Sequence, residues 1–456
     1  MKKRVLFAAM LLCAVFLLIA ACGRTDDPAE AGTTLGDAQA AAPTFDFGGR
    51  VIRITNPWGP MGTNLERGMS ADGDLFLDRI AEVEEMLNVQ VEIFRGPDGY
   101  WDIVVPSILA GEPFAEIKFS FPWQFINWYL AGAVKDITDL FDWNDPDIVP
   151  SITDIATLGG RKFGIGVDTP NFESALIFNK RLLEEAGLES PFDLVDQGRW
   201  DFATLREYAR ILTTSTDGTG VINQWGLGSP YISNLFHTAV FSAGGQWADV
   251  SVSPPRIMAD SPATMDGLNF VNDMHNIDGS ILVPPPGEGS AFGIAAFVNG
   301  QVAMLVAPAW VIDSVNAGDM TDTFGVVPFA MGPRATDFVT PVLPHPWVIP
   351  VTSDDELARA TLHTFVELFR PLHPELTLEE RLTIAAMGMV HDERSLENVV
   401  RLRTDWAVAN PTGMVGMGGL ISEVINGILD QVGTPASIIN AGIEAAQIYV
   451  NERFGG

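Results

Sequence analysis

Cysteine is almost absent from this sequence, since Cys13 and Cys22 are the only two in 456 residues. The chain also contains no CxxC pair and no HExxH, GxxxxGK[ST] or GxSxG motif. Thiol-redox enzymes, zincins, P-loop proteins and serine hydrolases depend on those motifs, so the sequence supports none of these classes. Six histidines are scattered without a pair at metal-ligand spacing, so we expect no metal site and no cofactor.

A calcium loop is the one alternative to this expectation. Asp142, Asn144, Asp145 and Asp147 supply oxygen ligands at short spacing. Pro146 and the missing glycine break the EF-hand pattern, which argues against a bound ion.

Positive charge is scarce as well. The 27 Lys and Arg residues stand against 58 Asp and Glu residues, which gives a formal net charge of −31. Such a surface repels phosphate backbones, so we expect no nucleic-acid partner. Solubility or a saline habitat explains the acidity by itself. Hydrophobic residues make up 47% of the chain and predict a globular protein with a sizeable core.

The N-terminus has the pattern of a bacterial targeting segment. Residues 2–4 are basic, residues 5–19 form an apolar run too short to span a bilayer, and LIAAC at 18–22 resembles a lipobox. We expect a signal peptide over residues 1–21 and a lipid such as palmitate on Cys22, with an uncleaved anchor as the alternative. The protein is then expected outside the cytoplasm, held by its lipid at the outer face of the bacterial cell membrane.

The next part of the chain predicts a tether and a parallel sheet. Residues 22–46 are small, polar and unpatterned, as in a flexible linker. Residues 51–55 and 89–93 then have the pattern of strands, and the apolar spacing over residues 76–87 predicts a helix between them. Ligands bind beyond the carboxyl ends of such strands, so the loop that contains Trp58 is a candidate site.

A second strand–helix unit begins at Ala175. The apolar run Ala175–Phe178 predicts a strand that is buried on both faces. Asn179 can cap a helix that stops at Gly187, and Asp201 can cap a second helix. Apolar residues at i, i+3, i+4 and i+7 over residues 205–212 predict that one face of that second helix is buried.

Several landmarks occur in order along the chain: AVKDITDL at 133–140, FNKRLLEEAGL at 178–188, DGTG at 217–220 and FVNGQVAM with PAW at 297–310. This series resembles the family 1 extracellular solute-binding proteins, the ligand-capturing components of bacterial ABC sugar importers. The resemblance covers the chain after residue 45.

The resemblance implies an α/β, two-lobed fold of the type II periplasmic-binding-protein kind. Each lobe would be a mostly parallel sheet flanked by helices, and the ligand cleft would lie between the lobes. Lobe 1 is expected to contain residues 47–165 and about 346–395. Lobe 2 is expected to contain residues 166–345 and about 396–456.

The resemblance also implies ligand-binding residues where strands end and in the loop that joins the lobes. These residues are Trp58, Trp123, Asp168, Glu173, Tyr231 and Trp310. The aromatic rings would supply platforms for sugar faces, and the carboxylates would accept hydrogen bonds from hydroxyls. Core packing is the alternative for each aromatic residue, and a solvated loop carboxylate is the alternative for Glu173. His345 either touches ligand or lies in a surface loop.

The implied function is that a monomer captures a carbohydrate, an oligosaccharide, by hinge closure and delivers it to ABC permease subunits without catalysis. A surface glycoside hydrolase is one alternative, because such an enzyme needs only two suitably spaced carboxylates. A solute sensor for a signalling partner is another. The identity of the sugar stays open. Trp123-Gln124 replaces the acidic–basic pair of maltose binders, and Met414 and Met417 stand where those proteins have a Trp.

Overall fold

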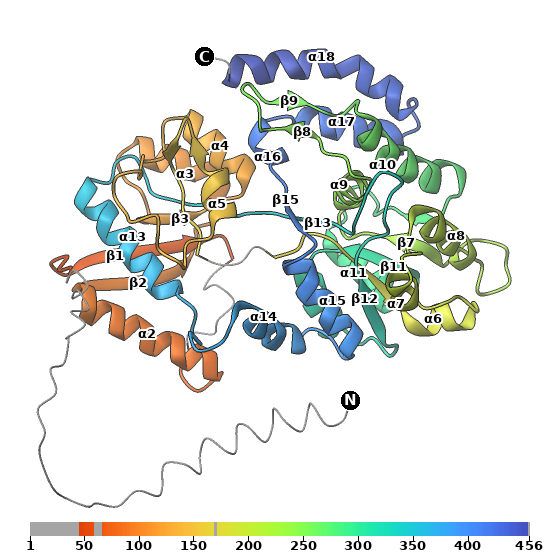
Figure 1. Cartoon of the computed structure of the whole chain (residues 1–456), viewed down its shortest axis with the longest axis horizontal. Helices are drawn as coiled ribbons and strands as arrows, with labels where there is room; N and C mark the ends of the chain where they lie inside the picture. Colours follow the sequence, from red (N-terminus) through yellow and green to blue (C-terminus); the bar gives the residue numbers. More distant parts are fainter. Residues whose placement is uncertain (1–44, 59–65, 168–170, 455–456) are drawn as a thin grey trace, which may run out of the picture. The chain divides into compact units, whose positions relative to one another are not determined.

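The computed structural model describes residues 45–58, 66–167 and 171–454. The predicted signal peptide, Cys22, most of the tether and Asp168 lie outside the described residues. Within the described residues, the secondary structure alternates between strands and helices and forms two main sheets (Figure 1).

The first sheet has four strands. Their spatial order is β14 (Trp347–Val348), β3 (Ile117–Phe119), β1 (Arg50–Asn56) and β2 (Val89–Arg95). β1 runs parallel to both β2 and β3, whereas β14 pairs with β3 in the antiparallel direction. α2 (Ala71–Leu87) connects β1 to β2 and buries Val83 and Leu87, so the predicted strand–helix–strand unit is confirmed.

The second sheet has five strands. Their spatial order is β10 (Ile281–Leu282), β7 (Trp225–Gly228), β11 (Val302–Ala307), β6 (Ala175–Asn179) and β12 (Phe324–Val327). β7 is parallel to β10 and β11, but β6 is antiparallel to both of its neighbours. This sheet is therefore more mixed than the sequence alone predicted.

The local signals around β6 are confirmed. All five residues of β6 are buried, as the apolar run predicted. The Asn179 side chain accepts a hydrogen bond from the Leu182 amide at 3.1 Å and begins α6 (Lys180–Glu185). Gly187 then adopts a φ of +69°, a left-handed conformation that ends a helix at little steric cost.

Helices pack around each sheet. Those that contribute to the cores around the first sheet are α2, α3 (Tyr100–Leu109), α4 (Pro122–Leu130), α5 (Pro150–Ile155) and α13 (Asp355–Phe369). Those that contribute to the core of the second sheet are α6, α7 (Pro191–Asp196), α8 (Phe202–Leu212), α9 (Ile232–Ser242), α10 (Pro262–Asn272), α11 (Ser290–Val298), α12 (Ala309–Asn316), α14 (Leu378–Met387), α15 (Glu393–Arg403), α17 (Gly418–Leu429) and α18 (Pro435–Phe454). A π-helix (Asp273–Ile277) extends α10. In the part of the chain that the structure describes, none of these helices has the length and apolarity needed to cross a membrane.

Three segments that run between the sheets lie side by side. The first passes Ile165, which bridges to Trp347, and Phe172, which bridges to Val342, before it enters β6. The second contains β13 (Thr340–Val342) and continues into β14. The third contains β15 (Ala407–Ala409), which pairs with β13 in parallel. These crossing strands connect two separate cores, and the lobe boundaries given above stay a prediction.

Candidate ligand-binding site

An aromatic cluster lies at the edge of the first sheet where β1 and β3 end. The ring of Trp58 lies 5.1 Å from Phe119 and 5.8 Å from Phe121, both edge-on. Phe121 stacks on Trp123 with 4.6 Å between ring centroids and an interplanar angle of 10°. The side chains of Trp58 and Trp123 remain 64% and 41% exposed. The structure thus brings two predicted site residues together through Phe121.

Local sequence features fix the positions of the Trp58 and Trp123 rings. The Asn56 side chain accepts a hydrogen bond from the Trp58 amide at 2.8 Å, which turns the chain directly after β1. Pro122 starts α4 immediately after Phe121, and proline suits the first turn of a helix because its missing amide would have no partner there. Trp123 is consequently fixed in the first turn of α4.

His345 belongs to the same cluster. Its ring lies 4.9 Å from Phe119 and 5.1 Å from Phe121, and its Nε2 is buried without a hydrogen-bond partner among the described residues. Burial lowers the pKa of His345 to about 4, so the ring is neutral at physiological pH. His345 lies in the loop between β13 and β14 and is only partly buried, and its imidazole packs within the aromatic cluster.

A second aromatic pair lies at the edge of the second sheet. Tyr231 follows β7, and Trp310 stands in the first turn of α12 after β11. Their rings lie 6.2 Å apart with an interplanar angle of 58°, and their side chains are 45% and 44% exposed. The Ser229 hydroxyl lies 2.8 Å from the Tyr231 carbonyl and 2.9 Å from the Val306 carbonyl, so its one proton can be donated to either and link the two strand ends.

Glu173 stands at the same edge, just before β6. The Phe172 carbonyl accepts a hydrogen bond from the Ala309 amide at 3.2 Å, and the Glu173 amide donates to Pro341 at 2.9 Å. The Glu173 carboxyl is half-buried and has no side-chain hydrogen bond or ion pair within the described residues. Burial raises the pKa of Glu173 to about 7. Among the residues that the structure describes, this carboxyl group is therefore an available hydrogen-bond acceptor beside the crossing strands.

The structure joins the predicted residues in two groups. Trp58 and Trp123 form one, and Tyr231 and Trp310 form the other. Phe172, the residue before Glu173, is hydrogen-bonded to Ala309 beside Trp310. Across the described ranges, no ring contact connects the groups directly. Sequence reasoning missed Phe119 and Phe121, although the alternation of aromatic residues at 119, 121 and 123 was a usable signal.

The contacts of Arg370 with Asp145 and Asp147 argue against the calcium alternative. Arg370 donates to the Asp145 carboxylate at 2.7 Å and also pairs with Asp147 and Glu367, so a guanidinium occupies the place of the proposed ion. In the described parts of the chain, no three His, Cys, Asp or Glu side chains are arranged to hold a metal.

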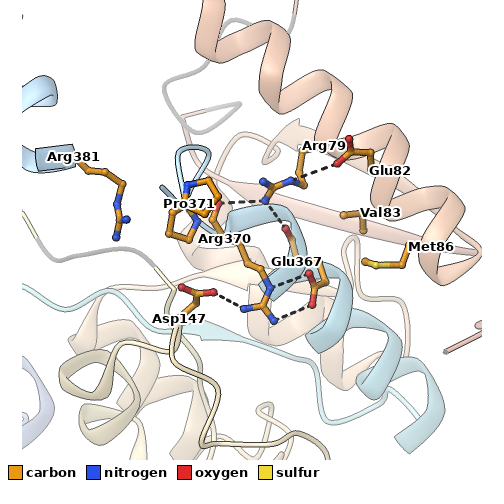
Figure 2. Close-up of a pocket in the computed structure, with 10 residues that line it drawn as sticks. Arg79, Glu82, Val83, Met86, Asp147, Glu367, Arg370, Pro371 and Arg381 are labelled. Carbon is orange, nitrogen blue, oxygen red and sulfur yellow. Dashed lines mark hydrogen bonds and ion pairs between the residues drawn. The ribbon is translucent and has the colours of Figure 1, made fainter. Parts of the chain in front are cut away.

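A pocket of about 380 Å³ lies beside this ion-pair network (Figure 2). α2, the end of α13, the segment that follows α13 and the start of α14 line it. Figure 2 shows Arg79 beside Glu82, Arg370 paired with Glu367 and Asp147, and Arg381 apart from these pairs. None of the predicted site residues lines this pocket. Its charges are largely paired with one another and it offers no aromatic ring, so we place the candidate site at the two aromatic groups instead.

Comparison with known proteins identifies the family and the fold of this chain. The sequence model of the family described as "Bacterial extracellular solute-binding protein" matches residues 84–367. No curated protein sequence matches the chain.

Solved structures extend the match over nearly the whole chain. An ABC substrate-binding protein from Listeria monocytogenes in complex with cycloalternan has 16% sequence identity and a TM-score of 0.61, covering 89% of this chain and 99% of the other. A maltose/maltodextrin-binding domain from Bdellovibrio bacteriovorus bound to maltotriose has 15% identity and a TM-score of 0.59, covering 89% and 100%. The cyclic alpha-maltosyl-1,6-maltose binding protein from Arthrobacter globiformis has 15% identity and a TM-score of 0.63, also covering 89% and 100%.

Identities this low show a shared fold and nothing finer. The α/β, two-lobed fold of binding proteins is thereby confirmed for this chain. Because the family model covers well over half of the sequence, the chain belongs to the family of bacterial extracellular solute-binding proteins.

Proposed function

We propose that this protein captures an oligosaccharide outside the cytoplasm and delivers it to the permease of an ABC importer. The observation that carries the proposal is the pair of partly exposed aromatic groups at sheet edges next to the crossing strands. Sugar rings have apolar faces edged with hydroxyls, so rings such as Trp58, Trp123, Tyr231 and Trp310 provide platforms for them. Glu173 supplies an acceptor for hydroxyl groups.

The solved relatives support a carbohydrate ligand. Proteins with this fold are bound to cycloalternan, maltotriose and maltotetraose. Asp168, predicted for the same role as Glu173, stands five residues before it in the sequence. We therefore propose that Asp168 and Glu173 supply polar contacts and that the aromatic residues supply stacking.

Closure about the crossing strands is the proposed means of capture. Phe172, β13 and β15 are joined by short stretches of backbone pairing, and the Thr340 hydroxyl also donates to the Ser174 carbonyl. Small changes of backbone dihedral angle in such segments can rotate one packed core relative to another. A ligand that contacts both cores would favour the closed form by the difference between its affinities for the two forms.

We further propose a lipid anchor on Cys22, a monomeric state and a docking partner in the transmembrane subunits of the permease. Replacing Cys22 with Ser should move the protein from the membrane fraction to the soluble fraction. A variant that stays membrane-bound would contradict the anchor. Permease genes beside the coding sequence would favour import over a sensor role.

One observation favours a glycoside hydrolase as a second candidate function. Glu173 has a pKa of about 7 because of burial, which suits a general acid. Incubation of the purified protein with maltotriose, followed by chromatography of the products, tests this alternative. Intact sugar after prolonged incubation supports binding without catalysis, whereas shorter products favour the hydrolase.

A thermal-shift screen tests the main proposal. We would use maltotriose, cycloalternan and tagatose, with glycerophosphocholine as a ligand that is not a sugar. An oligosaccharide at 100 times its dissociation constant should add about 2.7 kcal/mol to the free energy of unfolding. A shift with glycerophosphocholine alone would overturn the carbohydrate assignment.

A further inference from the structure

The third crossing segment brings a short helix against the first aromatic cluster. α16 (Thr412–Val415) follows β15 and packs on the first turn of α4, where Trp123 stands. Met414 is buried in a core around the first sheet together with Phe125 of α4. The next residue, Val415, is buried in the core of the second sheet. α16 is therefore anchored to both cores.

Gly413 makes this close approach sterically feasible. A Cβ atom at residue 413 would lie 3.1 Å from Cε3 of Trp123, 3.2 Å from the Trp123 amide nitrogen and 3.2 Å from Cβ of Pro122. These separations are shorter than ordinary van der Waals contacts, so an added methyl group would push α16 and α4 apart.

Phe121 and Gly413 are two neighbours of the Trp123 indole. Its ring stacks on Phe121 with 4.6 Å between centroids, and Cε3 faces the backbone of α16 at Gly413. The side chain nevertheless remains partly exposed. Since α4 begins at Pro122, the backbone of Trp123 has little freedom to move away from a bulkier neighbour.

We propose that Gly413 is a positioning residue for Trp123. The missing side chain lets α16 set the orientation of the indole in the aromatic cluster, and the third crossing segment thereby controls one wall of the site. The ligand contact of Trp123 rests on the proposed function, whereas the fixing of its ring by α16 does not.

The first arm of the test needs no ligand. The full chain is labelled with 5-fluorotryptophan, and the Trp123 resonance is assigned from its loss in Trp123→Phe. Gly413→Ala should shift this resonance. The matched control is Gly419→Ala in α17, where a Cβ would meet nothing within 4 Å. Met414→Ala loosens the anchor of α16 without adding atoms, so it tests the same coupling if Gly413→Ala fails to fold.

The second arm measures maltotriose affinity by calorimetric titration. Gly413→Ala should weaken binding about tenfold, as overpacking displaces the indole, and Gly419→Ala should leave it unchanged. In a Trp123→Ala background the effect of Gly413→Ala on affinity should shrink, because the residue it acts through is gone.

The outcomes separate the two hypotheses. An unmoved Trp123 resonance in both Gly413→Ala and Met414→Ala overturns the positioning role. A shifted resonance with unchanged maltotriose affinity supports the positioning role and removes Trp123 from the proposed binding site. If the wild-type protein does not bind maltotriose, the proposed ligand is wrong. The fluorine spectrum then still tests whether Gly413 positions Trp123.

Discussion

At the scale of single residues, exposure separates the tryptophans that can meet a ligand from those that hold a core. Trp200 and Trp247 are fully buried in the core of the second sheet. Trp58, Trp123 and Trp310 are partly exposed beside strand ends. Burial in a core therefore does not explain the positions of these three tryptophans. The sequence alone could not distinguish them from Trp200, because all four are the same residue type.

Trp310→Ala should weaken sugar binding much more than it destabilises the fold. Loss of a stacked indole is expected to cost about 2–4 kcal/mol of binding free energy. The free energy of unfolding of the ligand-free protein should fall by less than about 1 kcal/mol, because the side chain is nearly half exposed. Calorimetric titration and denaturant unfolding measure the two quantities.

Trp247→Ala is the matched control for that experiment. This residue is fully buried, so its truncation should cost about 3–5 kcal/mol of stability and leave the affinity of the remaining folded protein unchanged. Reduced stability with normal affinity in Trp310→Ala would remove Trp310 from the site.

Sugar affinity should fall as the pH is lowered from 8 to 5 if Glu173 accepts hydrogen bonds from hydroxyls. Its pKa is about 7 without ligand, and hydrogen bonds to the carboxylate would favour the charged form in the complex. At low pH the Glu173 carboxyl is protonated in the free protein and must lose this proton when the sugar binds. The cost of this deprotonation lowers the affinity for the sugar. Glu173→Gln should make the affinity nearly independent of pH, and an unchanged pH profile in that variant would exclude this role.

Lys118→Met should stabilise the protein, most strongly near pH 6. Lys118 is fully buried on β3, and burial lowers its pKa to about 7 from 10.5. Between these two values the unfolded chain holds a proton that the folded chain has lost, so stability rises with pH across this range. The expected gain is on the order of 3 kcal/mol at pH 6.

Denaturant unfolding of both proteins at pH 6, 8 and 10 checks the Lys118 prediction. Glu116 would keep its hydrogen bonds to Arg53 in the variant, so removal of the lysine leaves no unpaired carboxylate. The difference in free energy of unfolding between the two proteins should shrink as the pH rises. A constant difference would show that the buried charge of Lys118 is not its cause.

At the scale of helices and strands, elements with strong local signals were predictable. β6 follows from a run of apolar residues, and α6 and α8 follow from capping residues and apolar spacing. The antiparallel direction of β6 was not predictable, because it depends on how the first crossing segment enters the second sheet. The aromatic cluster was predicted only in part, since the contact of His345 with Phe119 joins residues more than two hundred positions apart.

Asp201→Ala should destabilise the protein by about 1 kcal/mol through loss of a helix cap. The Asp201 side chain accepts a hydrogen bond from the Thr204 amide at 2.8 Å at the start of α8. Asp201→Asn should retain most of the stability, because asparagine caps helices nearly as well. Equal losses in the two variants, measured by denaturant unfolding, would show that the cap is not responsible.

At the scale of the whole molecule, the proposed mechanism is a change in the relation between two packed cores. Small-angle scattering with and without maltotriose should show a smaller radius of gyration in the bound state if the crossing strands act as a hinge. The same measurement on Trp310→Ala at equal sugar concentration is the control and should show less compaction. An identical radius in both states of the wild type would rule out closure as the means of capture.

The order of strands in the sheets also governs when this chain can fold. The first sheet is completed by β14, and the core of the second sheet includes residues as late as Val450. The strands of each sheet can pair with one another earlier, but neither core is complete until these late segments have been made. If the chain is exported as proposed, late closure of its cores would leave the polypeptide open enough to pass through a narrow translocation channel before it folds.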